Sequence, residues 1–276
     1  MIRKAVRFIC FDLGQRAATV TRIIILTLCP ASVPAAAPPG YNQLMNKSEI
    51  LQYLKANQDA RGIAHWKEHK EKSGGLMSFG FGLTKLRKFS KTIGRDPKLA
   101  RQLWQSQIYE MKIIALLIDD PKTMTIEQVE SQVEQLQGGY LAHVFSSCDA
   151  PLAKAPFVVE LADKWIKSKD PVRRRCGYGL LYEISKSKKK SAPEDEYFLA
   201  HIAHIDKTYE KQSTDSLLSM GGALMGIGKR SKALNAAALK VAVKIGPIDF
   251  DPDGSCDPMD FAKHLTSDYI KNKLGL

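Results

Sequence analysis

The apolar residues of this chain follow a helical period over most of its length. From Ser48 onward they recur every three or four positions, and the strict alternation typical of half-buried strands is nearly absent. Helix start and stop signals interrupt the period about every 15 residues. Asp96-Pro97 and Asp170-Pro171 each place an N-cap before a proline suited to the first helical position, and Gly94 and Gly246 follow the last periodic residues of two other segments. The sequence therefore predicts a series of short helices joined by short loops.

Helices of this length cannot bury an apolar face alone. About a dozen helices of roughly 10 to 16 residues must pack in stacked pairs, as they do in an α-solenoid. We therefore predict an all-α fold arranged as an α-solenoid. Because no strict repeat period is visible, a compact helical bundle is the alternative. Trp66, Trp104 and Trp165 lie on apolar faces and are expected in the core.

Five glycines lie inside the helical pattern of the second half. Gly177, Gly179, Gly221, Gly222 and Gly226 each cost up to about 1 kcal/mol against Ala in a helix. Close packing between neighbouring helices would explain them. A widened groove is the functional alternative.

Residues 1–44 differ from the rest of the chain. They hold five basic residues and one acidic residue, an apolar run at 23–29 and a segment rich in Pro and Ala. Three interpretations stay open: translation that begins at Met45, where Ser48 would cap the first helix; an export or organelle signal; or a disordered arm. The apolar run is shorter than the about 20 residues that a transmembrane helix needs. We therefore treat residues 1–44 as a leader and residues 45–276 as one domain, and we predict no membrane partner.

The charge of the chain is strongly positive. It has 41 Lys and Arg against 29 Asp and Glu, a formal charge of +12 and a pI ≈ 9.4. Five of these basic residues and one of the acidic residues belong to the leader, so residues 45–276 keep a charge of +8. A surplus of this size favours a polyanionic partner such as nucleic acid. The five cysteines are widely spaced and form no CxxC pair, which favours a reducing compartment and predicts a cytoplasmic protein.

Several segments, taken in order, resemble one family of helical-repeat proteins. Phe79–Trp104 has an aromatic-Gly entry, a Leu-Arg helix and a short helix ending in Leu-Trp, and Ile108–Pro121 continues with a Glu-bearing helix ending in Asp-Pro. Similar segments follow at Val172–Arg175, Ile227–Ala238 and Asp251–Pro258. Together they resemble the DNA alkylation repair (AlkD-like) family of HEAT-like repeat proteins. The resemblance implies an α-solenoid of HEAT-like helical repeats, an armadillo-like α-α superhelix whose positive concave face grips duplex DNA.

The resemblance also implies a chemistry. In the active branch of the family, an N-glycosylase removes alkylated purines such as 3-methyladenine and 7-methylguanine, without flipping the base into a pocket as other base-modifying enzymes do. It relies on two Trp side chains and one Asp that face the lesion. Aromatic faces and a carboxylate stabilise the developing oxocarbenium sugar and the cationic base.

The three catalytic positions of the family are changed in this sequence. The first Trp falls on Gly139, the Asp on His143 and the second Trp on Gly222. Tyr140 would replace the first Trp after a shift of one residue, but no carboxylate lies nearby. A glycine has no aromatic face, and a histidine cannot supply the negative charge that the transition state needs. We therefore predict that base excision has been lost.

Basic residues are better represented than the catalytic ones, and either phosphate contact or an ordinary solvated face would explain them. Clusters spaced one or two helices apart can follow a phosphate backbone along a curved surface. The predicted phosphate contacts are Arg87, Lys88, Arg173, Arg174, Arg175, Lys188, Lys189, Lys229 and Arg230. DNA is thus the expected partner of a monomeric protein.

No cofactor or metal is expected. His65 and His69 share one helix face, but no third ligand is evident. Two other functions remain as alternatives: an active alkylpurine glycosylase that uses Tyr140, His143 or other groups, and a protein-interaction solenoid that does not meet DNA. Release of a free alkylated base and salt-dependent DNA binding separate the three.

Overall fold

The computed structural model describes residues 45–68, 74–136, 139–148, 150–250 and 256–276. The leader at 1–44, His69 and part of the segment Asp251–Pro258 lie outside the described residues. The side chains of residues 139 and 140 lie outside them as well.

The described part of the chain consists of short helices and carries no β-strand, only isolated bridges. The α-helices are α1 Lys47–Ala56, α2 Ala60–Glu68, α3 Leu83–Ile93, α4 Pro97–Trp104, α5 Tyr109–Ile118, α6 Ile126–Glu134, α7 Gly139–Ser146, α8 Val158–Ile166, α9 Pro171–Ser185, α10 Asp195–Thr208, α11 Thr214–Ile227, α12 Lys232–Ile245, α13 Phe261–Leu265 and α14 Asp268–Leu274. Two 3-10 helices lie at Pro151–Lys154 and Tyr209–Lys211. None of the described helices is long and apolar enough to cross a membrane.

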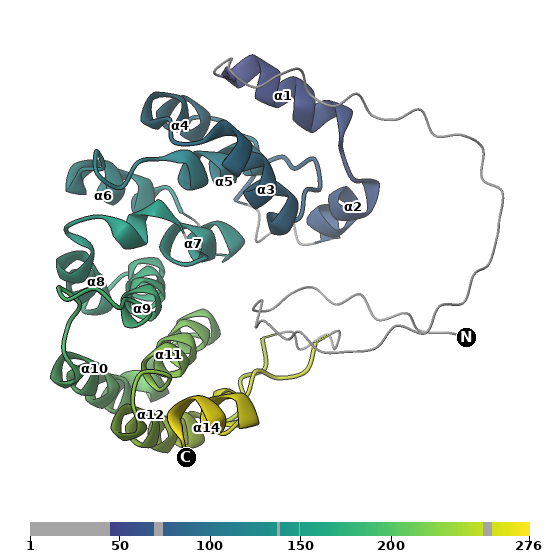
Figure 1. Cartoon of the computed structure of the whole chain (residues 1–276). Coiled ribbons are helices and arrows are strands. Elements are labelled where there is room, and N and C mark those ends of the chain that lie inside the picture. Colours follow the sequence, from purple (N-terminus) through teal and green to yellow (C-terminus); the bar gives the residue numbers. More distant parts are fainter. Residues whose placement is uncertain (1–44, 69–73, 137–138, 149, 251–255) are drawn as a thin grey trace, which may run out of the picture. The chain divides into compact units, whose positions relative to one another are not determined.

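Within the unit Leu44–Leu276, the helices form two rows that follow the chain order (Figure 1). We call α3, α5, α7, α9 and α11 the inner row, and α4, α6, α8, α10 and α12 the outer row. Each inner helix contacts the next inner helix, and the pairs α4–α5, α8–α9 and α11–α12 join the rows. Contacts between sequential neighbours are the mark of a solenoid. The all-α prediction and the α-solenoid prediction are confirmed, and the compact bundle is wrong.

The helices begin where short polar side chains cap them. The side chains of Asp96, Thr125, Asp170, Ser213 and Ser231 each accept a hydrogen bond from a backbone N–H of the first turn. The prediction for the first helix was wrong by two residues, because Asn46 caps α1 and Ser48 lies inside it. Asn46 has Glu49 three residues later, and the two form a reciprocal capping box that Ser48 cannot form.

The core lies between the two rows. Trp104 and Trp165 are buried, as expected, together with Phe145, Tyr178 and Phe198. Trp66 departs from the prediction because it is half-exposed. Its ring is tilted by 39° against Tyr109 at a centroid distance of 4.5 Å, and its indole N–H donates to the Leu76 carbonyl. It therefore belongs to the edge of the core, where one face of an indole can remain wet.

The helical glycines allow close approach between helices. A Cβ on Gly177 would lie 2.7 Å from the backbone nitrogen of Ile166 in α8, so no larger residue fits there. In α11, a Cβ on Gly226 would meet Ser185 and Tyr182 of α9. Gly222 is also buried within α11. Close packing therefore accounts for Gly177 and Gly226.

Candidate nucleic-acid interface

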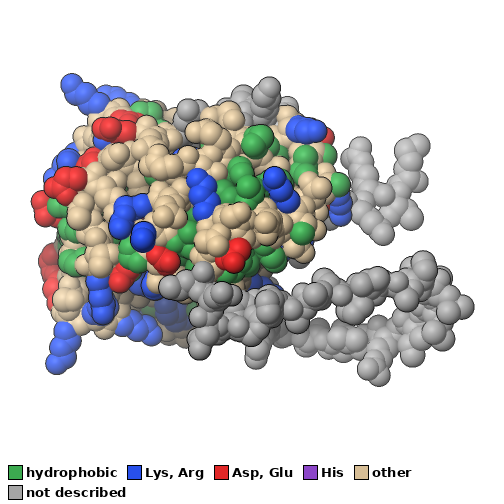
Figure 2. Space-filling model, turned by 90° about the horizontal axis from the view of Figure 1, so that it is seen from above, with side chains coloured by type: hydrophobic (Ala, Val, Ile, Leu, Met, Phe, Trp, Pro, Cys, Tyr) green, Lys and Arg blue, Asp and Glu red, His purple; other side chains and the backbone are tan. Residues whose placement is uncertain are grey.

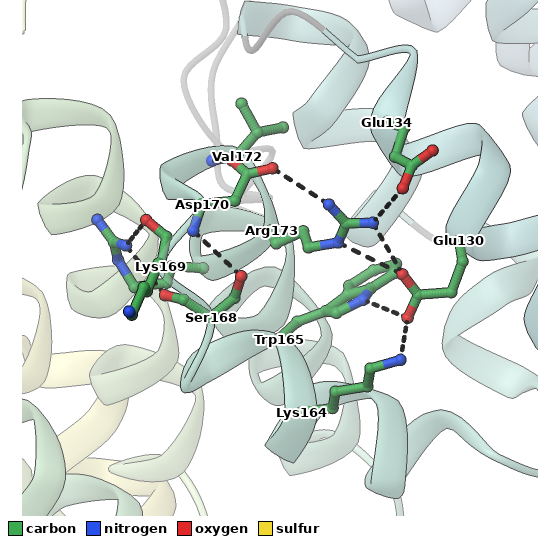
Figure 3. A network of polar contacts seen from close by, with 10 residues as sticks. Glu130, Glu134, Lys164, Trp165, Ser168, Lys169, Asp170, Val172 and Arg173 are labelled. Atoms are coloured by element: carbon green, nitrogen blue, oxygen red, sulfur yellow. Dashed lines mark hydrogen bonds and ion pairs between the residues drawn. The ribbon is translucent and has the colours of Figure 1, made fainter.

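Three consecutive arginines open α9, and their side chains point in different directions because neighbouring residues on a helix are about 100° apart. The guanidinium of Arg173 lies in a polar network at the junction of α6, α8 and α9 (Figure 3). It donates to Glu130 at 3.0 Å and to Glu134 at 3.0 Å, and it lies 3.4 Å from Asp170. Three carboxylates therefore surround one cation.

Glu130 is the centre of this network, which we call the Arg173 network. Its other oxygen accepts hydrogen bonds from the Trp165 indole at 3.0 Å and from Lys164 at 2.9 Å. Burial favours its neutral form, but hydrogen bonds from Lys164, Arg173 and Trp165 outweigh burial and lower the pKa of the Glu130 carboxyl. The network thus fastens α6 to α8 and α9.

Arg174 belongs to α9, and its side chain reaches back to the loop between α8 and α9. Its guanidinium donates to the carbonyls of Ser168 and Lys169 at 3.0 and 2.7 Å, and to the side chain of Gln212 at 3.0 Å. These contacts satisfy backbone carbonyls of the loop that follows α8. The guanidinium of Arg174 is therefore occupied by hydrogen bonds within its own chain.

The side chain of Arg175 points instead toward α11, the next helix of the inner row. It forms an ion pair of 2.7 Å with Asp215, in the first turn of α11, and only 13% of its side chain is exposed. Its charge acts on His143 of α7, as does the charge of Arg87 of α3. The guanidinium of Arg87 donates to the Cys148 carbonyl at 2.6 Å.

These contacts bring together side chains from four inner helices, which we call the inner cluster. Its members are Arg87, His143, Cys148, Arg175 and Asp215. The Nε2 atom of His143 lies 2.9 Å from the Sγ atom of Cys148. Burial, and then the charges of Arg175 and Arg87, lower the pKa of His143 to about 4. At neutral pH the cluster therefore holds two guanidinium cations, one carboxylate and an uncharged imidazole.

The three positions that the sequence resemblance matches to the family's catalytic residues lie on helices of the inner row. Gly139 begins α7, and His143 follows one turn later on the same face. Because the surroundings of Gly139 and the side chain of Tyr140 lie outside the described residues, the suggested role of Tyr140 stays a prediction. Gly222 is buried in the middle of α11. Of these three predicted positions, His143 is the one on which the charges of Arg175 and Arg87 act.

Arg230 holds the loop between α9 and α10. Its guanidinium donates to the carbonyls of Ser185, Ser187 and Pro193, and it lies 4.4 Å from the centre of the Phe198 ring. The loop that it supports carries Lys188 and Lys189, both exposed. Arg230 therefore shapes a basic loop from within.

A second basic group forms near this loop, and we call it the C-terminal lysines: Lys186, Lys188, Lys189, Lys229 and Lys273. Burial, and then the charges of Lys273 and Lys186, lower the pKa of the Lys229 ammonium. Lys273 donates to the Lys229 carbonyl at 2.9 Å, and Lys186 pairs with Glu183 at 2.6 Å. Several lysines from three segments thus face each other across a short distance.

Net charge alone does not locate these groups. On the face seen in Figure 2, Lys and Arg side chains are spread across the surface, and most of the acidic side chains lie toward one edge. Lys88 of α3 is exposed, whereas its neighbour Arg87 is half-buried.

The sequence did not predict that Cys148 and Asp215 would join Arg87, Arg175 and His143. The spacing of five residues between His143 and Cys148 was the one local hint.

The comparisons with known proteins agree with the fold. A family model described as DNA alkylation repair enzyme matches residues 50–246, which is more than half of the chain. The chain therefore belongs to the DNA alkylation repair family, as the sequence motifs predicted.

A solved structure shares the architecture. It represents "a new family of proteins related to the HEAT-like repeat DNA glycosylases with affinity for branched DNA structures". The similarity has a TM-score of 0.71 and covers 84% of this chain and 97% of that chain, at 18% sequence identity. The prediction of a HEAT-like repeat solenoid is confirmed. No curated protein matches the sequence.

Proposed function

We propose that this chain binds DNA through its inner row and does not excise bases. The observation that carries the proposal is the charge of the inner cluster. Arg87 and Arg175 flank His143, which is neutral at pH 7, at the position where the family's glycosylases use a carboxylate. Positive charge attracts phosphate and opposes the cationic transition state of glycosidic-bond cleavage.

We further propose that the DNA is branched or distorted. The structural relative is described as having affinity for branched DNA structures, which supports this substrate class for the same architecture. Junctions bring phosphates of several strands close together, so positive groups placed along a curved row can contact several of these phosphates at once. The inner cluster and the C-terminal lysines offer two such groups.

The proposed contacts differ in their other partners. Arg173, Arg174 and Arg230 already donate to carboxylates or carbonyls of their own chain. A phosphate at these residues would have to compete with those bonds. Arg87 and Arg175 also donate to their own chain, at the Cys148 carbonyl and at Asp215, so a phosphate would compete there too. We therefore assign most of the predicted phosphate contact to the exposed lysines Lys88, Lys188 and Lys189 and to the half-buried Lys229. Arg87 and Arg175 are added because the charges of both act on one position of the inner row, His143.

The test measures binding of a fluorescent four-way junction and a matched duplex at two salt concentrations. Binding that weakens with salt and favours the junction is expected, with a slope that reports the number of phosphates contacted. The double variant Lys188→Gln/Lys189→Gln should lower that slope by up to about 2. The control is Lys240→Gln, on the exposed face of α12 in the outer row; it removes one positive charge outside these groups and should leave the slope unchanged.

A parallel assay measures excision from duplex DNA containing 7-methylguanine and 3-methyladenine. No release above the spontaneous rate is expected. Release well above that rate would overturn the loss of excision, and it would make Tyr140 and His143 the first residues to vary. Absence of both release and salt-sensitive binding would overturn the proposed function and favour a protein partner.

A further inference from the structure

Lys229 lies at the C-terminal end of the solenoid, where α11 meets the last two helices. It follows Gly228, the C-cap of α11, and it is half-buried. The Lys273 ammonium of α14 donates to the Lys229 carbonyl at 2.9 Å. Burial, and then the charge of Lys229, lower the pKa of His264 of α13, which places the Lys229 ammonium near that imidazole. The side chain of Lys229 therefore lies among groups of α13 and α14.

The interactions of the Lys229 ammonium favour the loss of its proton. Among the residues that the structure describes, no hydrogen bond or ion pair reaches this ammonium. Burial, and then the charges of Lys273 and Lys186, lower its pKa. Burial and a neighbouring cation are the two means by which proteins make a lysine amine nucleophilic, because the neutral amine is the form that attacks a carbonyl carbon.

Lys112 of α5 offers a contrast within the same chain. Its ammonium donates to the Trp104 carbonyl at 2.6 Å and lies 4.3 Å from the centre of the Trp104 ring. Burial lowers its pKa as well, but only 7% of the residue is exposed. Lys112 should therefore stay unreactive until the chain unfolds, whereas the half-buried Lys229 is accessible to a small reagent.

We propose that Lys229 is a reactive amine that captures aldehydes carrying phosphate groups. The neutral amine attacks the carbonyl carbon, so that an N–C bond forms and the π electron pair moves to the oxygen. A proton passes from the nitrogen to the oxygen, water leaves the resulting carbinolamine, and an imine remains. The step needs no oxidant or reductant.

The phosphate requirement follows from the neighbouring lysines. The ammonium groups of Lys273 and Lys186 are close enough to act on Lys229, so an anion attached to the aldehyde is attracted to the same place. DNA offers such an aldehyde at an abasic site, where the sugar that has lost its base opens between two phosphates. A small phosphorylated aldehyde is the other source of the same chemistry. The DNA source rests on the proposed function, whereas the reactivity of the amine does not.

The first experiment treats the full chain with pyridoxal 5′-phosphate and sodium cyanoborohydride, which reduces an imine to a stable secondary amine. Peptide mass spectrometry gives the labelling rate at each lysine. At neutral pH, Lys229 should be labelled several-fold faster than the exposed Lys240. Pyridoxal, which lacks the phosphate, should show a smaller preference for Lys229. Equal rates at the two lysines would overturn the reactive amine, and equal preferences with the two aldehydes would overturn the phosphate requirement.

Variants separate the reactivity of Lys229 from the integrity of the fold. With pyridoxal as the probe, Lys273→Gln should raise the pH at which labelling of Lys229 is half-maximal and slow the labelling at neutral pH. Lys229→Arg keeps the charge but forms no imine, so the labelled peptide should disappear. Lys240→Gln is the control and should leave Lys229 unchanged. Lys112 must stay unlabelled in each variant until urea is added. Unchanged or faster labelling of Lys229 in a folded Lys273→Gln variant would contradict the proposed activation.

The source of the aldehyde is tested with a four-way junction that carries one abasic site. Cyanoborohydride should join this junction covalently to Lys229. A junction that binds but is not trapped, while pyridoxal 5′-phosphate still labels Lys229, would assign the aldehyde to a small molecule. A junction that does not bind at all, with the same labelling, would overturn the proposed function and leave the reactive amine standing.

Discussion

Arg173 and Arg175 are two residues apart on α9, yet they lie in opposite electrostatic surroundings. Three carboxylates surround Arg173, whereas Arg175 shares one carboxylate with a neighbourhood that also contains Arg87. The first arrangement is locally neutralised and joins helices. The second places two guanidinium cations on the inner row. A run of arginines is thus not one functional unit, because the role of each guanidinium depends on the acidic residues that the fold places near it.

The largest expected effect concerns stability in the Arg173 network. Arg173→Leu keeps much of the side-chain volume but leaves Glu130 with fewer donors, and it should lower the free energy of unfolding by about 2 kcal/mol. Urea unfolding followed by circular dichroism measures this loss. Lys164→Gln removes a mostly exposed partner of the same carboxylate and should cost less than about 0.5 kcal/mol. Equal losses in the two variants would contradict the central role of Arg173.

The second prediction concerns DNA binding, in which Arg175 should matter more than Arg173. Arg175→Gln should weaken junction binding about fivefold at low salt and reduce the salt slope by about 1, because one phosphate contact is lost. Arg173→Gln should change neither value beyond the measurement error, provided that the binding is measured well below its unfolding temperature. Fluorescence anisotropy titrations give both numbers. A larger effect on DNA binding at Arg173 than at Arg175 would contradict this assignment of the phosphate contact.

The third prediction uses the pH dependence of the inner cluster. The unfolded chain takes up a proton on His143 below about pH 6.5, whereas the folded chain resists it down to about pH 4. The depressed pKa therefore contributes stability that is complete above pH 6.5 and is lost as the pH falls toward 4. His143→Gln should remove about 1 kcal/mol of this dependence, seen as a flatter stability profile in that window. An unchanged profile would show that His143 is not the group responsible.

The smallest effect is expected from Glu130, and it lies in a different pH window. Its pKa is lowered in the folded chain, so its contribution is present above 4.5, the ordinary value, and is lost as the pH falls below it. Glu130→Gln should flatten the stability profile below pH 4.5 by a few tenths of a kcal/mol, after allowance for solvent screening. Thermal unfolding at closely spaced pH values resolves it. A loss confined to the range above pH 5 would argue against the network.

Much of the architecture could be predicted because its causes are local. The N-caps at Asp96, Asp170 and Ser231 act within three residues of themselves, and the apolar period is a property of each helix alone. The first cap was missed for a local reason also, since Asn46 and Glu49 compete with Ser48 as a capping pair. The family followed from the order of several such local segments.

The candidate site depended on contacts between residues distant in the sequence. Arg173 meets Glu130 across 43 positions, Arg175 meets Asp215 across 40, and Arg87 meets the Cys148 carbonyl across 61. No spacing rule connects such pairs, because the stacking of helices decides which side chains share a junction. The sequence by itself therefore determined the helices, the family and the positive charge of this protein. Only the tertiary structure decided which cations are neutralised, because the Coulomb interaction depends on distance in space and not along the chain.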